Sequence, residues 1–362
     1  MSGNFMASLY DRVRLRKRVA ALAGLQPWAV YLLARVGSIA LVLLGICTIT
    51  FIITRLLGNP VYLLVGQQTS PEIVSNMTHR MGLDRPLYEQ YFRYLWSLGH
   101  GDLGVSRYTF RPVLEDIALR LPATLELVLC AMGFILVAGV PLGILAAARR
   151  GGWADRLVQA LAQLGASVPN FWLGLLLIFC FFYLIPLFPA PLGRLDDPAQ
   201  APPVVTGLLL LDSLLAHNRA AFWSALQHLM LPSITLAAGA IPATLQITRN
   251  SLLEVLASDF TRTALAYGIN KRIVYFRYAL KNILVPVTTV LAMTLGFLIS
   301  GTILVETVFS WPGIGLYAVD AMNHFDYEPI IAVVLISALF YALAYLLADI
   351  LQFVIDPRIR AR

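Results

Sequence analysis

Long stretches without Lys, Arg, Asp or Glu alternate with short polar connections along the chain. Crossing about 30 Å of bilayer hydrocarbon as a helix takes about 20 apolar residues. Six uncharged stretches reach about that length: Val36–Thr54, Leu127–Ala148, Leu157–Gly193, Ala220–Thr248, Asn282–Val305 and Pro329–Ala348. Each predicts one membrane-spanning helix, and the pattern as a whole predicts an all-α polytopic membrane protein with six transmembrane helices.

The third stretch is the least regular. It has 37 residues, and three prolines interrupt its far end. We expect an amphipathic entry over Leu157–Ala166, and we expect Pro169 to kink or begin the spanning part, because proline lacks the N–H that a helix interior needs. A separate apolar run, Val204–Leu211, is too short to span and predicts an interfacial or re-entrant segment.

Composition supports a membrane protein. Hydrophobic residues make up 59% of the chain, charged residues 13%, and the mean hydropathy is +0.74. Soluble domains carry about 25% charged residues. The net charge of +7 comes without interleaved aromatic and basic residues, so nucleic acid is not an expected partner. Cys47, Cys130 and Cys180 stand singly inside apolar runs and predict small core residues.

The distribution of Lys and Arg predicts the orientation. Of the 27 basic residues, 17 lie in the two terminal tails and in the second-to-third and fourth-to-fifth connections, and eight lie in the opposite connections. By the positive-inside rule both termini are expected to be cytoplasmic. The predicted divisions are a basic cytoplasmic lead (1–30), a first span (31–57), an extracytoplasmic domain (58–120), a five-span core (121–353) and a cytoplasmic tail (354–362).

The predicted extracytoplasmic domain has a folded composition. Residues 58–120 contain six basic and six acidic residues together with several aromatic ones, and apolar positions recur periodically. We expect a small helical unit between the first two spans.

The connection between spans four and five carries the most local detail. Ser258 and Asp259 offer a helix cap, Phe260–Tyr267 predicts a two-turn helix, and Gly268 suits a left-handed stop. Asn270 can cap a second helix that runs through Lys271–Lys281 into span five. A short rigid helix between two spans suits transmission of displacement. An ordinary loop whose basic residues reach lipid headgroups is the alternative, and the residues alone leave both open.

The same segment resembles a known one. The residues Asp-Phe-Thr-Arg-Thr-Ala-Leu-Ala-Tyr-Gly at 259–268, followed by Asn-Ile-Leu-Val-Pro at 282–286, are similar to the EAA segment of ABC importer permeases. Thr263-Ala264-Leu265 stands where that signature has Glu-Ala-Ala, and Gly268 lies 18 residues before Pro286. Both features are usual in the dipeptide/oligopeptide/nickel branch. Further motifs similar to that branch occur in order: Gly82–Pro86, Gly101–Gly104, Leu121–Glu126, Gly139–Gly143, Ser167–Trp172, Glu306–Gly313 and Asp356–Arg360.

The resemblance implies a type I ABC importer permease fold in a bacterial inner (cytoplasmic) membrane. It implies that the 259–268 helix inserts into a groove on an ATP-hydrolysing subunit. The implied partners are a second homologous permease, two cytoplasmic ATP-binding subunits and an extracytoplasmic solute-binding protein. The implied ATPase-coupling residues are Asp259, Phe260, Arg262, Thr263, Ala264 and Gly268. The implied cargo is a dipeptide or oligopeptide, with haem, nickel complexes and antimicrobial peptides as alternatives.

A second candidate segment follows span five. Its Pro-Gly turn and the acidic residue before it suggest an external gate or pathway element, formed by Glu306, Ser310, Trp311, Pro312 and Gly313. Ionisable residues inside a membrane are functional suspects by default. Glu126, Glu306 and Asp349 nevertheless lie close to predicted span ends, and helix-end placement is the simpler interpretation of them.

The sequence contains no G-x-x-x-x-G-K-[ST] phosphate loop and no paired metal-ligand spacing among its five histidines. We therefore expect no catalytic residue, no metal and no cofactor in this chain, and ATP bound by partner subunits. The rival class is a secondary transporter, which would place charges at mid-membrane and break helices around a central site. Few charges inside the predicted spans argue against it.

Overall fold

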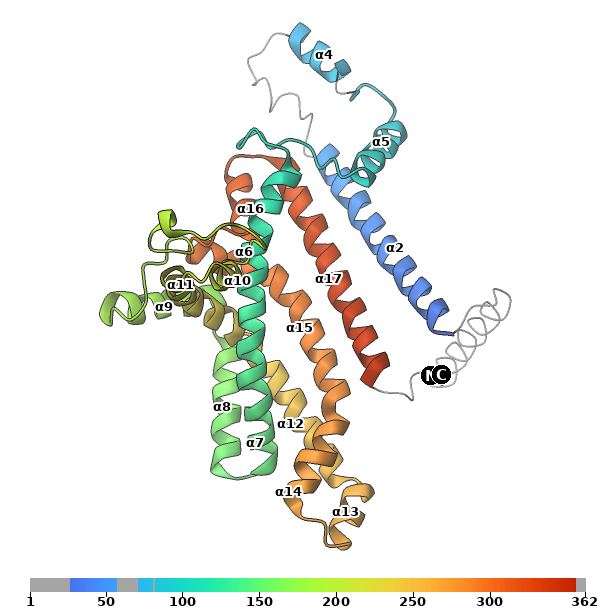
Figure 1. Ribbon diagram of the computed structural model, residues 1–362. Coiled ribbons are helices and arrows are strands. Elements are labelled where there is room, and N and C mark those ends of the chain that lie inside the picture. Colours follow the sequence, from blue (N-terminus) through green and yellow to red (C-terminus); the bar gives the residue numbers. More distant parts are fainter. Residues whose placement is uncertain (1–26, 57–70, 81, 356–362) are drawn as a thin grey trace.

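The computed structural model describes residues 27–56, 71–80 and 82–355, and these residues are predominantly helical (Figure 1). Within those ranges the only β-type pairing is an isolated bridge between Val105 and Pro112. The all-α prediction is confirmed for this part of the chain. Most of the predicted lead, up to residue 26, and the predicted tail beyond residue 355 lie outside the described residues.

Four continuous helices are long and apolar enough to cross a membrane. They are α2 (Pro27–Leu56), the run of α6 (Val113–Phe134) through a π-helical turn (Ile135–Gly139) into α7 (Val140–Ala148), α15 (Leu280–Val308) and α17 (Tyr327–Ile355). The second of these begins at Val113, ahead of the predicted domain boundary at residue 121.

Two further candidate spans are bent pairs of helices. α8 (Trp153–Ser167) and α9 (Asn170–Ile178, continued by a π-helical turn over Phe179–Leu184) meet at 101°. α11 (Arg219–Ala238) and α12 (Ile241–Ala257) meet at 54°. The described chain therefore has four continuous candidate spans, and up to six if each bent pair crosses once.

The first bend has the predicted cause. Val168, which precedes Pro169, is extended with φ −91° and ψ 125°, and Pro169 is extended as well. The proline ring disfavours helical geometry in the residue before it. The helix that ends at Ser167 therefore stops, and a new one begins at Asn170, as the sequence indicated.

The second bend was not predicted, since Ala220–Thr248 reads as one uninterrupted span. The break falls at Gly239 and Ala240, where the Asn170 side chain of α9 packs against the chain: a Cβ on Gly239 would lie 2.6 Å from Asn170 Oδ1. The start of α9 thus packs into the α11–α12 corner. We call this contact the bend contact.

The core lies among α6, α11 and α15, with α9 packed against it. Its fully buried members include Leu127, Leu229 and Leu298, one from each of the three helices. Helices cross closely at small residues: a Cβ on Gly143 would lie 2.7 Å from the Leu245 carbonyl oxygen, between α7 and α12. Small residues at helix crossings let the backbones of membrane helices approach each other closely.

Figure 1 shows two ends of the molecule. At one end, the α13 end, lie α13 (Asp259–Ala266) and α14 (Lys271–Ile273), with the start of α2 and the finish of α17. The opposite end, the α16 end, carries α4 (Pro71–Arg80), α5 (Leu87–Gly99) and α16 (Ile314–Asn323). The long connection after α9 contains a 3₁₀ turn (Pro198–Gln200) and α10 (Leu209–Leu215), and the run Val204–Leu211 does not span.

The segment that follows α5 is fastened to the α16–α17 connection. Asp326 is fully buried, and one of its oxygens accepts hydrogen bonds from the Ser106 hydroxyl (2.7 Å) and from the backbone nitrogens of Arg107 (2.7 Å) and Tyr108 (3.2 Å). The Arg107 guanidinium donates to Glu328 at 3.0 Å. Three donors on one buried carboxylate oxygen hold this loop in place.

Candidate functional site

The predicted short helix is present as α13, and it ends as the sequence indicated. Gly268 has φ +77°, its nitrogen donates to the Leu265 carbonyl at 3.0 Å, and the Ile269 nitrogen donates to the Ala264 carbonyl at 3.2 Å. These two bonds form a Schellman motif, which needs a left-handed residue that glycine adopts without strain. The predicted glycine stop is confirmed.

The start of α13 differs from the prediction. Ser258 occupies the cap position, but its hydroxyl donates to the Val255 carbonyl at 2.6 Å instead of accepting from the helix. The side-chain capping prediction for Ser258 is therefore wrong. The buried Thr261 hydroxyl donates to the same carbonyl at 2.7 Å, so both hydroxyls fasten α13 to the last turn of α12. Sequence reasoning missed Thr261.

The predicted coupling residues divide between two faces of α13. Ala264 is buried, with Thr261, against the neighbouring helices. Asp259, Phe260, Arg262 and Thr263 are exposed. The Arg262–Asp259 pair is 3.7 Å apart and open to solvent, so it contributes little to stability. Phe260 is half-exposed and rests edge-on against the Tyr278 ring.

α13 continues into α15 with little intervening loop. The Asn270 side chain accepts from the Arg272 nitrogen at 2.8 Å, which confirms its predicted capping role. The chain then runs through α14 and a π-helical turn (Val274–Ala279), in which Val274 and Ala279 are fully buried, directly into α15. The turn over residues 267–270 is therefore all that separates α13 from a continuous helix leading into α15.

The second predicted segment lies at the other end of α15. Glu306 is fully buried, and its two oxygens face different partners. One accepts from the Thr124 hydroxyl of α6 at 2.7 Å, and the other accepts from the backbone nitrogens of Gly315 (2.7 Å) and Leu316 (3.0 Å). The carboxylate thus occupies the N-terminus of α16, where the helix dipole and free N–H groups stabilise an anion. Helix-end placement alone, the simpler interpretation of Glu306, does not describe this arrangement.

The turn between α15 and α16 is packed onto α6. Trp311 is buried, and its indole nitrogen donates to the Ala123 carbonyl at 2.9 Å. Gly313 has no room for a side chain, since a Cβ would lie 2.4 Å from Glu306 Oε2. Ser310, which has φ +48°, and Pro312 face outward.

A second carboxylate of α6 belongs to the same region. Glu126 is buried, and it accepts from the Arg194 guanidinium at 2.5 Å and from the Leu210 nitrogen at 2.7 Å. The Arg194 guanidinium also lies 5.7 Å from the Trp311 ring centroid. We call Thr124, Glu126, Arg194 and Glu306 the buried carboxylate junction. Sequence reasoning missed Arg194, whose signal was that it is the single arginine or lysine between Pro189 and Asn218.

The structure keeps the two predicted segments apart. α13 precedes α15, and Glu306 of the buried carboxylate junction is the third residue from the far end of this 29-residue helix. At 1.5 Å per residue the helix is about 43 Å long, more than the thickness of bilayer hydrocarbon. α15 is therefore long enough for its two ends to lie on opposite sides of a membrane.

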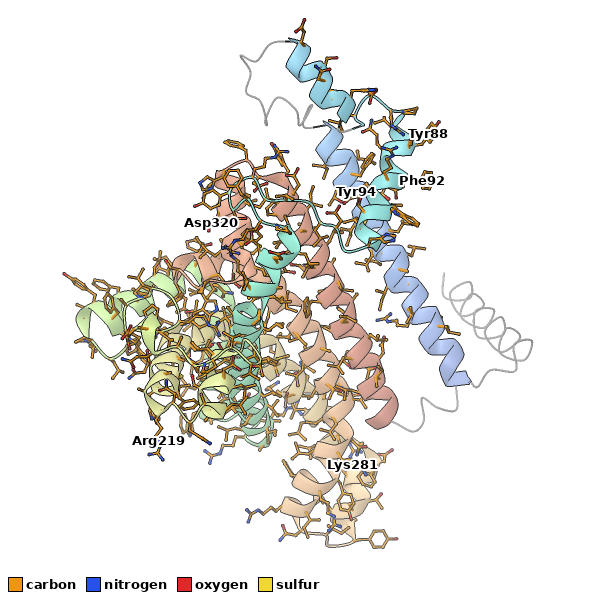
Figure 2. All side chains as sticks on the ribbon, turned by 45° about the horizontal axis from the view of Figure 1, so that its top comes forward. Tyr88, Phe92, Tyr94, Arg219, Lys281 and Asp320 are labelled. Atoms are coloured by element: carbon orange, nitrogen blue, oxygen red, sulfur yellow. The ribbon has the colours of Figure 1, made fainter. Side chains whose placement is uncertain are left out.

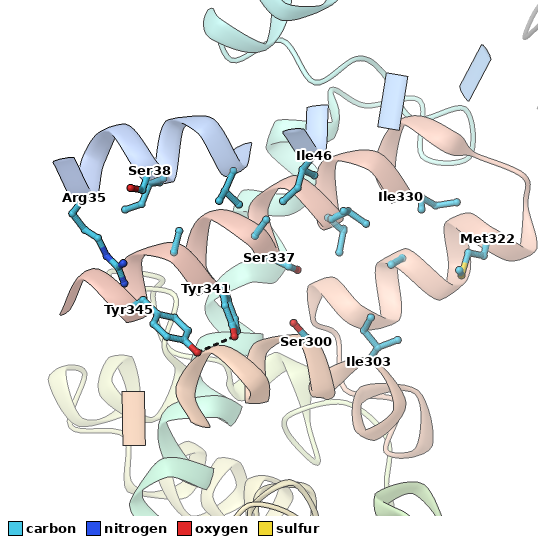
Figure 3. Close-up of a pocket in the computed structure, with 17 residues that line it drawn as sticks. Arg35, Ser38, Ile46, Ser300, Ile303, Met322, Ile330, Ser337, Tyr341 and Tyr345 are labelled. Carbon is cyan, nitrogen blue, oxygen red and sulfur yellow. Dashed lines mark hydrogen bonds between the residues drawn. The ribbon is translucent and has the colours of Figure 1, made fainter. Parts of the chain in front are cut away.

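A large apolar cavity of about 720 Å³ lies between α2 and the helices α15, α16 and α17 (Figure 3). Arg35 lines it from α2 and forms an ion pair with Asp349 of α17 at 2.6 Å. The hydroxyls of Tyr341 and Tyr345 are 3.1 Å apart in its wall. Asp349, which the sequence indicated as a helix-end residue, thus joins α17 to α2 through its ion pair with Arg35. No cluster of metal-ligating side chains occurs among the described residues.

These features define a class: a helical protein with several candidate membrane spans, a short helix fastened at one end and a buried, hydrogen-bonded turn at the other. Comparison with known proteins then gives the family. The model of the "Binding-protein-dependent transport system inner membrane component" matches residues 139–361, and the model of its N-terminal part matches residues 29–128. The chain belongs to this family, and it is an inner-membrane component with multiple spans. The rival class of secondary transporter is thereby excluded.

Similar proteins cover almost all of the chain. It is 44% identical over 333 residues to the "Probable D,D-dipeptide transport system permease protein" of Escherichia coli K12, covering 92% of this chain and 97% of that one. It is 38% identical over 335 residues to the dipeptide transport system permease protein of the same organism, covering 91% and 98%. A structure of the inward-facing MetNI methionine ABC transporter matches with 17% identity and a TM-score of 0.48, covering 65% of this chain and 93% of that one.

The family also bears on chemistry and partners. Its members are permease subunits of ATP-driven systems and carry no catalytic activity themselves. A binding-protein-dependent system works with an extracytoplasmic binding protein and with ATP-hydrolysing subunits.

Proposed function

We propose that this chain forms half of the pathway by which an ATP-driven importer moves dipeptides or oligopeptides across the inner membrane. Dipeptide transport is the function named for the two similar Escherichia coli proteins, which are 38–44% identical to this chain over more than nine-tenths of its length. The other half of the pathway is a second, homologous permease. Two ATPases sit on the α13 end, and the binding protein delivers peptide at the α16 end.

The fold that supports this function is the six-span, type I importer arrangement, in which each bent pair crosses the membrane once. Both termini are then cytoplasmic. The α13 end, where α13 lies with the start of α2 and the end of α17, is the cytoplasmic end. α4 and α5 lie on the extracytoplasmic side.

The observation that carries the coupling role is the division of α13 into two faces. Thr261 and Ala264 are packed against the permease, whereas Asp259, Phe260 and Arg262 are presented outward. A helix held on one side and free on the other is suited to a groove on a partner. Gly268 ends the helix at a defined point, so that the outward face has a defined length.

The mechanism follows from the connection of α13 to α15. Closure of the ATPases on ATP displaces α13, and α15 tilts with it because only the four-residue turn 267–270 separates α13 from the continuous helix of α14 and α15. The far end of α15 carries Glu306, which is bonded to α6 and α16. The tilt therefore repacks the buried carboxylate junction, and the turn Ser310–Gly313 opens or closes one side of the pathway as a packed two-state element.

Transport by the assembled complex tests the proposal. The chain is co-expressed with its cognate permease, ATPases and binding protein, and the complex is reconstituted into vesicles. Uptake of a radiolabelled dipeptide should require ATP and the binding protein together. Uptake driven by a proton gradient without ATP, or ATP-driven uptake of a nickel chelate or haem in preference to peptides, would contradict it.

A further inference from the structure

One face of α5 is apolar, and no other described part of the chain covers it. Tyr88, Phe92 and Trp96 are spaced four residues apart and form a single row along the helix. All three are about two-thirds exposed. Figure 2 shows Tyr88 and Phe92 projecting from α5 away from the other helices. We call these three residues the aromatic row.

The opposite face of α5 is fixed to α2. The Tyr91 hydroxyl is 2.6 Å from the Thr48 hydroxyl, and the Tyr94 hydroxyl is 3.1 Å from that of Thr50. Both tyrosine rings also pack against Phe51. The aromatic row is therefore held at a fixed height along α2.

The contact with α5 lies near the end of the apolar run of α2, which is where we place the boundary of the membrane. The apolar span of α2 runs from Leu33 to Ile53, so Thr48 lies five residues inside its end. At 1.5 Å per residue this is about 8 Å from the edge of the apolar run. α5 therefore lies beside the last turns of a spanning helix, and the Tyr91 hydroxyl reaches below the boundary.

The charges of α5 lie on a third face, beside the aromatic row. Glu89 and Arg93 are one turn apart and 3.4 Å from each other, and Glu89 also pairs with Arg85. The helix thus carries, in order around its axis, a face packed on α2, an aromatic face and a charged face. Aromatic side chains concentrate at membrane interfaces, and a helix with this division lies in the interface with its apolar face in lipid.

Below α5, the same side of α2 is apolar and exposed. Leu44 and Leu41, four and seven residues before Thr48, are both exposed, and the aromatic row continues that apolar surface outward. We propose that the aromatic row of α5 inserts into the interfacial layer of the bilayer at the α16 end, and that it anchors the segment after α2 to the lipid surface.

Spin labels on neighbouring residues test this in the full chain. Cys47, Cys130 and Cys180 are replaced by alanine, and single cysteines are introduced by Phe92→Cys or Arg93→Cys. The chain is reconstituted into vesicles of phosphatidylethanolamine and phosphatidylglycerol. Collisions of the label with oxygen, which concentrates in lipid, are compared with collisions with a water-soluble nickel chelate.

The label at 92 should favour oxygen severalfold over the chelate, and the label at 93 should show the reverse. Leu41→Cys, on an exposed side of α2 outside the cavity, reports correct insertion, and labels at 88 and 96 repeat the measurement on the same row. Equal access of the chelate to 92 and 93 would place α5 in water. Protection of 92 from both reagents would place it under protein. Either result overturns the proposal.

Discussion

Glu306 and Gly315 are matched in space: the carboxylate of Glu306 accepts the Gly315 N–H at 2.7 Å, and a Cβ on Gly315 would lie 2.8 Å from the same oxygen. The first turn of α16 can approach the carboxylate only because Gly315 has no side chain. The contact joins α15 to α16, and the Thr124 hydroxyl joins both to α6.

Two substitutions of Glu306 distinguish the effect of its charge on stability from the effect of its hydrogen bonds. Glu306→Leu leaves the Thr124 hydroxyl and two N–H groups without an acceptor, and each unsatisfied buried donor costs about 1–3 kcal/mol. Glu306→Gln can keep its carbonyl oxygen on the N–H groups and donate its amide to Thr124, so it should cost less. Thermal unfolding of the detergent-purified chain measures both, with the exposed Glu254→Gln as control. Equal melting temperatures for the three variants would contradict this role.

Gly313→Ala should destabilise the turn through a close contact, since its Cβ would lie 2.4 Å from Glu306 Oε2. The matched control is Gly301→Ala within α15, where the nearest atom is 4.0 Å away. Alanine is favoured over glycine in a helix interior by about 1 kcal/mol, so the control should be neutral or stabilising. Gly313→Ala should lower the melting temperature, and Gly301→Ala should leave it unchanged or raise it.

Gly268→Val should uncouple ATP hydrolysis from the binding protein, because a left-handed conformation costs a non-glycine residue about 1–2 kcal/mol. A Cβ at this position meets nothing within 4 Å, so strain and not collision is the cause. Gly268→Asn, which tolerates positive φ better, should retain most of the coupling. Stimulation of ATPase activity by peptide-loaded binding protein is the measurement.

Gly151 provides the control for that experiment. It has φ +76° and open space around it, but it lies in the α7–α8 turn. Gly151→Val should strain the backbone equally and leave the stimulation intact. Loss of stimulation in both variants, or in neither, would remove the coupling role from α13.

The Arg194–Glu126 pair should show strong coupling in a double-mutant cycle. Removing one partner of a buried ion pair typically costs about 3–5 kcal/mol, because the other charge is left buried. Arg194→Met and Glu126→Gln should each destabilise the chain, and the double variant should be more stable than the sum of the two losses predicts. The exposed pair Asp259–Arg262 is the control and should show no measurable coupling.

Labelling with an impermeant thiol reagent tests the orientation. Phe110 and Tyr267 are each more than four-fifths exposed, and they lie on opposite sides of the predicted membrane. In a cysteine-free background, Phe110→Cys should react from outside intact cells, and Tyr267→Cys should react only after lysis. Labelling of residue 267 from outside would reverse the topology.

The fold was predictable where one residue decides the local geometry. Uncharged runs located the spans, Pro169 located the first bend, and Gly268 located the end of α13. The second bend was not predicted, although Pro242 at the start of α12 is a local signal for it. What the sequence does not show is that Asn170, from a different helix, occupies the space beside Gly239. A glycine within an apolar run does not indicate which side chain will approach it.

The candidate site divides in the same way. Its local elements, the short helix and the Pro-Gly turn, were found from spacing. The buried carboxylate junction was not, since Glu126, Arg194 and Glu306 come from three separate parts of the chain. Ser258 was mispredicted because its hydroxyl had a nearer acceptor, the Val255 carbonyl, in the helix before it.

The bend contact has a consequence for how the protein is made. Asn170 leaves the ribosome before Gly239, so the α8–α9 corner enters the membrane without the chain that later packs against it. Pro169 sets the break of that corner locally, but the start of α9 gains its packing surface only when α11 and α12 have been synthesised and inserted. The α8–α9 corner of the nascent protein therefore lacks its packing partner until the later half of the chain is made. A chain truncated before residue 239 lacks that surface altogether.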